Sequence, residues 1–265
     1  MAIQYDMSLR HGVDFDFRLD GKIAVVTGGL GGIAMATNAA LIAKGARVAI
    51  FYPSFEEPRV KDAIEALGAA NAAAFACDVA NEADVAKAMK AALDRFGDLH
   101  LLVNAAGCIT LTPAEDISLD EWQKQIGVNL TGPFLCSKHF ARHVLASGHG
   151  GKIVNIASQA ATVAIDKHCA YTSAKAGLIG MTKVLAKEWA LRGITVNTIS
   201  PTVVLTPMGA AAWQGEKGEA MKKQIPVGRF AYTDEIAAAI LFLLSNGADM
   251  ITGADIMIDG GYTIC

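Results

Sequence analysis

Short apolar runs alternate with helical segments along almost the whole chain, and this alternation narrows the possible folds most. The first run, residues 22–29, is rich in Val and Ile and ends in glycine. Runs that are apolar throughout, rather than at every second residue, indicate strands buried on both faces of a parallel sheet. The predicted strands are 22–29, 47–52, 73–78, 99–107, 151–158, 194–201 and 254–261, and the predicted helices are 34–45, 56–68, 82–96, 118–145, 170–192 and 234–245.

This series predicts an α/β fold with one doubly wound domain, a parallel sheet of roughly seven strands and helices on both faces. No linker-like tract divides the chain, so we expect a single domain over residues 21–265, preceded by an N-terminal extension over residues 1–20. The segment 202–226 breaks the rhythm and carries Trp213, Gly215 and Gly218. A long irregular segment of this kind is typical of a mobile lid over a substrate site.

Composition excludes several classes of function. Hydrophobic residues make up 52% of the chain and charged residues 18%, which indicates a large core and argues against disorder. A net charge of −3 gives no reason to expect nucleic acid as a partner. The start of the chain has no apolar signal segment, and no uncharged run approaches the roughly 20 residues of a membrane helix. The five scattered cysteines fit free thiols. We expect a cytoplasmic protein with a small-molecule substrate and no membrane partner.

The first strand ends in a glycine-rich turn, TGGLGGIA, at residues 27–34. Gly28 permits the turn and Gly32 permits close approach of a ligand, so backbone N–H groups and a helix N-terminus can meet a pyrophosphate. Glycine alone is weak evidence, because many strand–helix turns contain it. Its place at the start of a strand–helix–strand unit favours nucleotide binding.

The end of the second predicted strand bears on the choice between NAD(H) and NADP(H). An NAD site usually offers an acidic group to the adenosine ribose there. This chain has Tyr52, followed by Pro53 and Ser54, and the nearest cation is Arg59. Tyr52 is predicted to lie near the adenine, and both cofactors remain open.

Three residues suggest acid–base chemistry. Ser158 closes a predicted strand, and the segment YTSAK places Tyr171 and Lys175 four residues apart on a predicted helix. Residues at this spacing share a helix face, and a nearby cation is expected to lower the tyrosine pKa. A tyrosine tuned in this way can serve as the general acid–base for an alcohol/ketone pair.

From about residue 20 to its C-terminus the chain resembles the short-chain dehydrogenase/reductase family. The motifs that carry the resemblance are TGGLGGIA (27–34), Asp78–Val79, NAAG (104–107), Asn129 in VNLTGPF, Ser158, YTSAK (171–175), SPTVVLT (200–206) and DGG (259–261). The resemblance implies a Rossmann-type domain and a homotetramer. It also implies that Tyr171 is the catalytic acid–base, Lys175 holds the nicotinamide ribose, Ser158 orients the substrate oxygen and Asn129 anchors a relay water.

The resemblance further implies a set of cofactor contacts along the chain. They are Gly28, Leu30, Gly32, Ile33, Tyr52, Asp78, Val79, Asn104, Ala105, Gly107, Tyr171, Lys175, Pro201, Val204 and Thr206. Two positions depart from the family pattern. Ala34 replaces the last glycine of the turn, which should be tolerated, and Thr202 replaces the glycine that usually follows Pro201, which leaves the path of the next segment open.

For the substrate, the C-terminal tail and the segment 202–221 resemble those of polyol and sugar-alcohol dehydrogenases of this family. We expect small polyols and their ketoses as substrates, contacted by Ser158, Tyr171, Gln159, His168 and Trp213. The alternative is reduction of a 3-oxoacyl thioester or another hydrophobic ketone. The basic side chains that keep it open are Lys217, Lys222, Lys223 and Arg229.

Other interpretations are less favoured. Cys136, His139 and His143 have metal-like spacing, but no second ligand cluster accompanies them, so packing is preferred and no metal site is predicted. His168 and Cys169 fit a pocket wall better than a nucleophile pair. A catalytically idle nucleotide sensor or a structural protein would not need Ser158, Tyr171 and Lys175 together.

Overall fold

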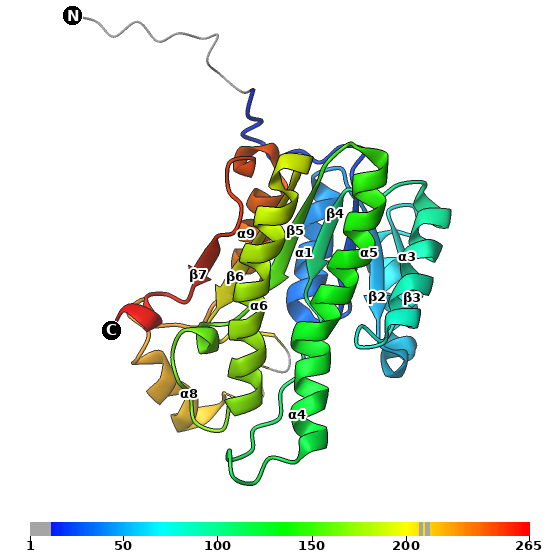
Figure 1. Cartoon of the computed structure of the whole chain (residues 1–265). Helices are drawn as coiled ribbons and strands as arrows, with labels where there is room; N and C mark the ends of the chain where they lie inside the picture. Colours follow the sequence, from blue (N-terminus) through cyan, green and yellow to red (C-terminus); the bar gives the residue numbers. More distant parts are fainter. Residues whose placement is uncertain (1–11, 207–208, 210–212) are drawn as a thin grey trace, which may run out of the picture.

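The computed structural model describes residues 12–206, 209 and 213–265 of the chain. Its seven strands form one parallel sheet in the order β3-β2-β1-β4-β5-β6-β7 (Figure 1). The strands are β1 (Ile23–Thr27), β2 (Arg47–Tyr52), β3 (Ala72–Ala76), β4 (Leu101–Asn104), β5 (Gly151–Ile156), β6 (Ile194–Pro201) and β7 (Asp255–Ile258). The predicted α/β class, the parallel sheet and the number of strands are confirmed.

Helices cover both faces of this sheet, as the uniformly apolar strands predict. The helices are α1 (Gly32–Ala43), α2 (Val60–Leu67), α3 (Glu82–Phe96), α4 (Leu119–Ile126), α5 (Gly132–Ser147), α6 (Cys169–Trp189), α8 (Gly215–Lys222) and α9 (Thr233–Leu244). Successive residues of β1 point to opposite sides: Ala24 and Val26 pack with α1, α2 and α9, whereas Val25 packs with α3, α5 and α6. Two separate cores therefore hold the layers together, with α3, α5 and α6 in front in Figure 1.

The structure departs from the predicted elements at three places. The predicted helix 118–145 is divided by a π-helical turn, Gly127–Thr131, between α4 and α5. The predicted helix 56–68 begins as a 3-10 helix, Ser54–Arg59, which contains Pro58. The segment 202–226 contains α8, and an isolated bridge between Val204 and Ala231 ties its start to the rest of the domain.

The described part of the N-terminal extension lies against the domain. The Asp14 N–H donates to the Asn246 side chain at 3.0 Å, and the Phe17 ring contacts Phe242 edge-on with centroids 5.7 Å apart. Leu19 is 4% exposed and joins the core. Residues 1–11 of the predicted extension and residues 207–208 and 210–212 of the predicted lid lie outside the described residues.

The strand order places a ligand site at the carboxyl edge of the sheet. The chain proceeds outward from β1 through β2 to β3 and then returns to β4 on the other side of β1. Thr27 therefore pairs with Asn104, so the glycine-rich turn after β1 lies beside the segment that follows β4. Open α/β sheets bind ligands in the crevice at such a switch point.

Candidate active site

The glycine-rich turn after β1 is held tightly. Gly28 has a φ of +59°, and a Cβ atom on it would lie 2.7 Å from the Cα of Ala106, so only glycine fits. The Thr27 hydroxyl accepts hydrogen bonds from the N–H groups of Ala105 and Ala106, both at 3.1 Å. Asn38 is fully buried on α1 and donates to the carbonyl of Gly29 at 2.9 Å. These contacts fix the turn before any ligand binds.

Helix α1 begins at the end of this turn with Gly32 as its first residue and Ile33 as its second. Its N-cap residue, Gly31, makes no side-chain capping bond, and no acidic residue lies in the first turn. The first N–H groups of a helix attract anions when no side chain satisfies them. The turn and the helix therefore suit a pyrophosphate.

The end of β2 carries more charge than the sequence indicated. Tyr52 is 5% exposed, and its hydroxyl donates to Glu57 at 2.5 Å. Burial and this carboxylate raise the pKa of Tyr52 to about 12. Arg59 reaches back over the glycine-rich turn, donating to the Leu30 carbonyl at 2.6 Å and to Glu56 at 2.6 Å. Two carboxylates and one guanidinium thus surround the expected ribose position, and the sequence pattern identified only the guanidinium.

The predicted adenine and ribose contacts fall into two kinds. Asp78 is exposed after β3, whereas Val79 is buried and packs against Gly132 at the start of α5. Asn104 is 1% exposed, and its side chain donates to Asn155 at 2.8 Å and to Ser137 at 3.1 Å. This side chain therefore joins β4, β5 and α5, while the backbone of residues 104–107 faces the crevice beside the glycine-rich turn.

Asn129 lies in the π-helical turn between α4 and α5 and is fully buried. Its amide donates to the carbonyls of Cys108 at 2.8 Å and Gln125 at 2.9 Å, and its oxygen accepts from the Cys108 N–H at 3.3 Å. A Cβ atom on Gly107 would lie 3.1 Å from that oxygen and 3.9 Å from the Lys175 ammonium. The π-turn thus positions Asn129 beside Lys175, and single π-turns are frequent at functional sites.

Ser158, Tyr171 and Lys175 meet at the carboxyl edge of the sheet. Ser158 follows β5, and the other two lie one turn apart on α6. The Ser158 side chain lies close enough to the Tyr171 hydroxyl to lower its pKa as a hydrogen-bond partner. The Lys175 ammonium lies 5.6 Å from the centroid of the Tyr171 ring and donates to the Ile156 carbonyl at 2.6 Å. The structure therefore brings together the three residues that the sequence selected.

Burial controls the titration of this group. It raises the pKa of Tyr171 above its ordinary value of 10.0, and the hydrogen bond with Ser158 opposes this only in part. Lys175 is 4% exposed, and burial lowers its pKa to about 8. In the chain by itself the pKa of Tyr171 is therefore raised and not lowered as the sequence predicted, because burial of the phenol outweighs the opposing effect of Ser158.

The residues predicted to contact the substrate are only partly brought together. His168 lies beside Tyr171, with the two rings edge-on and centroids 6.1 Å apart. Gln159 is 4% exposed, and its side-chain oxygen has no hydrogen-bond partner among the described residues. Trp213 instead packs on Phe230, with ring centroids 6.0 Å apart, and the Lys217 ammonium lies 4.5 Å from its ring centroid. Of these three residues, His168 contacts Tyr171.

The segment after β6 lies at the same carboxyl edge of the sheet. Pro201 is the last residue of β6, and Val204 forms the bridge to Ala231. The Thr206 hydroxyl accepts from the N–H of Gly209 at 2.9 Å. Thr202 replaces the glycine usual in the family; it is 8% exposed, and its hydroxyl has no hydrogen-bond partner among the described residues.

These features fit a dinucleotide with a carboxamide at one end. The glycine-rich turn and the free start of α1 suit the pyrophosphate. At the other end, the unpaired Thr202 hydroxyl can form a hydrogen bond with a carboxamide. A buried hydroxyl without a partner lowers the stability of the protein, and a bound ligand that supplies the hydrogen bond removes this penalty. No functional role was assigned to Thr27, Asn38 or Thr202 from the sequence. The role of Thr27 could have been predicted from its place at the end of the first strand.

Comparison with known proteins gives a consistent result. The family model described as enoyl-(acyl carrier protein) reductase matches residues 28–263. D-threitol dehydrogenase of Mycolicibacterium smegmatis is 53% identical over 254 residues, which cover 95% of this chain and 96% of that protein. NAD-dependent glycerol dehydrogenase of Listeria innocua is 44% identical over 253 residues, which cover 96% of this chain and 98% of that protein.

A solved structure shows the same architecture. The short-chain dehydrogenase/reductase of Serratia marcescens superposes with a TM-score of 0.87 at 35% sequence identity, covering 92% of this chain and 99% of that one. Identity at this level over nearly the full length carries family membership as well as fold.

Proposed function

Because this chain belongs to the short-chain dehydrogenase/reductase family, it is an NAD(P)-dependent oxidoreductase, and we propose that it interconverts small polyols and their ketoses. The observation that carries the reaction class is the grouping of Ser158, Tyr171 and Lys175 at the carboxyl edge of the sheet, where Ser158 influences the Tyr171 hydroxyl and buried Lys175 lies one helical turn from Tyr171. The relatives named for threitol and glycerol oxidation support polyols as the substrate class.

In the proposed reaction the chain's own residues move a proton. Bound nicotinamide accepts or supplies the hydride. Ser158 and Tyr171 orient the substrate oxygen, and Tyr171 takes the hydroxyl proton during oxidation. Lys175 holds the ribose and passes the proton onward beside Asn129. The glycine-rich turn, Tyr52, the 104–107 backbone and Thr202 hold the cofactor.

The direct test follows absorbance of the reduced nicotinamide while NAD⁺ and NADP⁺ are each supplied with polyols of three to six carbons. Oxidation of threitol or glycerol would support the proposal. No turnover on any polyol or ketose, with cofactor binding shown separately, would contradict it and favour 3-oxoacyl thioesters. The structure weakens that alternative, because two of the basic residues near the lid are paired: Lys222 with Glu219 and Arg229 with Glu235.

We propose NAD(H) as the preferred cofactor. Glu56, Glu57 and Arg59 together carry a net charge of −1 around the expected ribose, and Arg59 is already paired with Glu56. A 2′-phosphate would therefore meet repulsion. We expect the Glu56→Gln/Glu57→Gln variant to raise kcat/KM for NADP⁺ on the order of tenfold, about 1.4 kcal/mol. Glu65→Gln on α2 is the control, and an unchanged NADP⁺/NAD⁺ ratio would contradict the proposal.

His168 is proposed to recognise a substrate hydroxyl. Its Nδ1 lies 2.7 Å from the Asp166 carbonyl, so that nitrogen donates and Nε2 is left as an acceptor. We expect His168→Phe, which keeps a ring against Tyr171, to raise KM for polyols about tenfold through the lost hydrogen bond. KM for a simple cyclic alcohol should stay constant. Equal effects on both substrates would indicate a packing role only.

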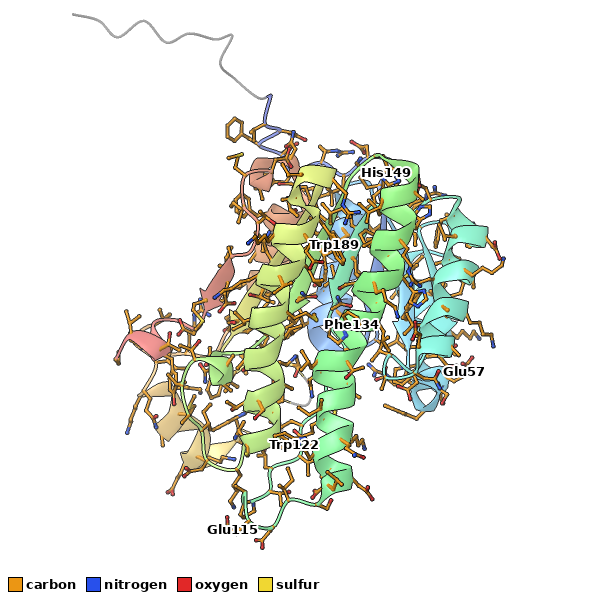
Figure 2. All side chains as sticks on the ribbon, viewed as in Figure 1. Glu57, Glu115, Trp122, Phe134, His149 and Trp189 are labelled. Atoms are coloured by element: carbon orange, nitrogen blue, oxygen red, sulfur yellow. The ribbon has the colours of Figure 1, made fainter. Side chains whose placement is uncertain are left out.

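We propose a cytoplasmic homotetramer. No helix in the described ranges is long and apolar enough to cross a membrane. Large apolar side chains are exposed on α4, α5 and α6, as with Leu119, Phe134 and Val184. Figure 2 labels Phe134 on α5. Light scattering during gel filtration measures the assembly, and a monomeric mass would contradict the tetramer.

A further inference from the structure

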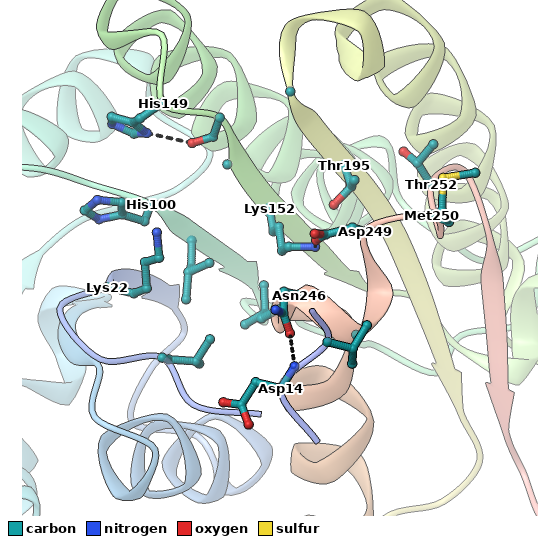
Figure 3. A pocket seen from close by; sticks show the side chains of 18 of the residues that line it. Asp14, Lys22, His100, His149, Lys152, Thr195, Asn246, Asp249, Met250 and Thr252 are labelled. Atoms are coloured by element: carbon teal, nitrogen blue, oxygen red, sulfur yellow. Dashed lines mark hydrogen bonds and ion pairs between the residues drawn. The ribbon is translucent and has the colours of Figure 1, made fainter. Parts of the chain in front are cut away.

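A second cluster of titratable side chains lies at the opposite edge of the sheet from Ser158 and Tyr171. Asp98 and His100 lie between α3 and β4, His143 lies near the end of α5, and His149 lies in the loop before β5. These residues come from three separate segments, and all are partly accessible to solvent. In Figure 3 the His149 ring lies beside that of His100, at the rim of a cavity of 1190 Å³.

The ligand atoms in this cluster converge on one carboxylate. Asp98 Oδ1 lies 2.6 Å from His143 Nε2 and 3.0 Å from His149 Nε2. One potential ligand atom from each of the three residues lies within 4.8 Å of the others. A tetrahedral zinc ion with bonds of about 2.1 Å holds its ligands about 3.4 Å apart. Small side-chain rotations therefore suffice to create that geometry.

The hydrogen bond made by Nδ1 of His149 leaves its Nε2 atom able to bind a metal ion. The Nδ1 atom lies 2.7 Å from the Gly150 carbonyl and donates its proton there, so the neutral ring has a lone pair on Nε2. That lone pair faces a carboxylate oxygen, and the contact is favourable only if a proton or a cation lies between them. Metal-binding histidines typically donate their other N–H to a backbone carbonyl in this way. Gly148 and Gly150, with φ of +73° and +75°, flank the residue.

His100 supports the cluster without joining it. Its Nδ1 accepts from the Ile23 N–H at 3.3 Å, so its proton lies on Nε2, which is 3.6 Å from Asp98 Oδ2. Its ring also stacks on that of His149, with centroids 4.8 Å apart. The Leu99 N–H donates to Asp98 Oδ1 at 2.7 Å. His100 and the Leu99 N–H thus orient the Asp98 carboxylate, as residues that do not bind the metal themselves orient the ligands in known metal sites.

We propose that Asp98, His143 and His149 bind one zinc ion, which joins the end of α3, the end of α5 and the loop before β5. Two imidazoles and one carboxylate are common zinc ligands, and solvent would complete the coordination. The residues with metal-like spacing in the sequence were Cys136, His139 and His143. Only His143 belongs to the proposed site, because Cys136 is fully buried and His139 pairs with Glu82.

The test is calorimetric titration of the EDTA-treated full-length protein with ZnCl₂. We expect one equivalent to bind to the wild type and binding to be lost in the His143→Ala/His149→Ala variant. His139→Ala, one turn earlier on α5, is the matched control and should bind normally. Titration with Co²⁺ should give the visible absorption of a low-symmetry site with nitrogen ligands. His100→Gln should weaken binding about 10- to 100-fold, because it removes only an outer partner.

Two results would overturn the proposal. Either the wild type binds no zinc, in which case the cluster is a protonated ion pair, or the double variant binds as well as the wild type, in which case the ion is adventitious. If circular dichroism shows that the double variant is misfolded, the graded loss in His100→Gln and the wild-type Co²⁺ spectrum decide the question.

Discussion

Replacing Tyr171 by Phe should lower kcat about 10²- to 10⁴-fold, the usual contribution of a general acid–base. The ring and its contact with His168 are kept, and only the hydroxyl bonded to Ser158 is lost. Cofactor binding, measured by quenching of protein fluorescence, should be nearly unchanged. Tyr232→Phe is the control, because Tyr232 is 51% exposed and its ring lies under Arg229.

The pH profile gives an independent check of the same assignment. Burial raises the pKa of Tyr171, and oxidation needs the phenolate, so the oxidation rate of the wild type should rise towards alkaline pH. The reduction rate should fall over the same range, because it needs the protonated phenol. Residual activity in Tyr171→Phe should lose this dependence. Undiminished turnover, or an unaltered pH profile, would show that another group carries the proton.

Replacing Lys175 by Met should reduce activity at least about 10²-fold and yet stabilise the protein near neutral pH. Lys175 is 4% exposed, and its pKa falls from an ordinary 10.5 to about 8. That difference in pKa corresponds to about 3 kcal/mol of unfavourable free energy for burying the ammonium. This is an upper bound on the stability gained in Lys175→Met, because the variant also loses the hydrogen bond to the Ile156 carbonyl.

The size of the stability gain depends on pH. Between about pH 8 and pH 10.5 the unfolded chain keeps the proton on Lys175 and the folded chain releases it, so this group makes the wild type more stable as the pH rises. The advantage of Lys175→Met should therefore be full below about pH 8 and shrink above it. Urea unfolding at several pH values measures this, with Lys183→Met, exposed on the same helix, as the control. A variant less stable than the wild type at pH 7 would contradict this interpretation.

Local patterns were sufficient for the fold. The strands are dominated by apolar residues because both faces of the sheet are covered, and this signal is complete within a few residues. The closeness of Tyr171 and Lys175 could be predicted from the sequence for a similar reason, because a helix places residues four apart on one face. Ser158 could also be predicted from the sequence, because it closes a predicted strand and therefore lies at the carboxyl edge of the sheet.

Other features depended on contacts between distant segments. The π-turn at Asn129 follows from packing between α4, α5 and the segment after β4, and no local pattern announced it. Arg59 likewise donates to the Leu30 carbonyl, which lies 29 residues earlier in the chain.

The sequence by itself determined the fold, the place of the glycine-rich turn and the choice of the proposed reacting side chains, because periodicity and short spacings encode them. Only the tertiary structure decided how those side chains titrate, since the pKa values of Tyr171 and Lys175 depend on how completely the surrounding segments exclude water. It also decided which histidines meet Asp98. Those residues are joined by the parallel pairing of β4 and β5, a relation between strands that no local spacing in the chain records.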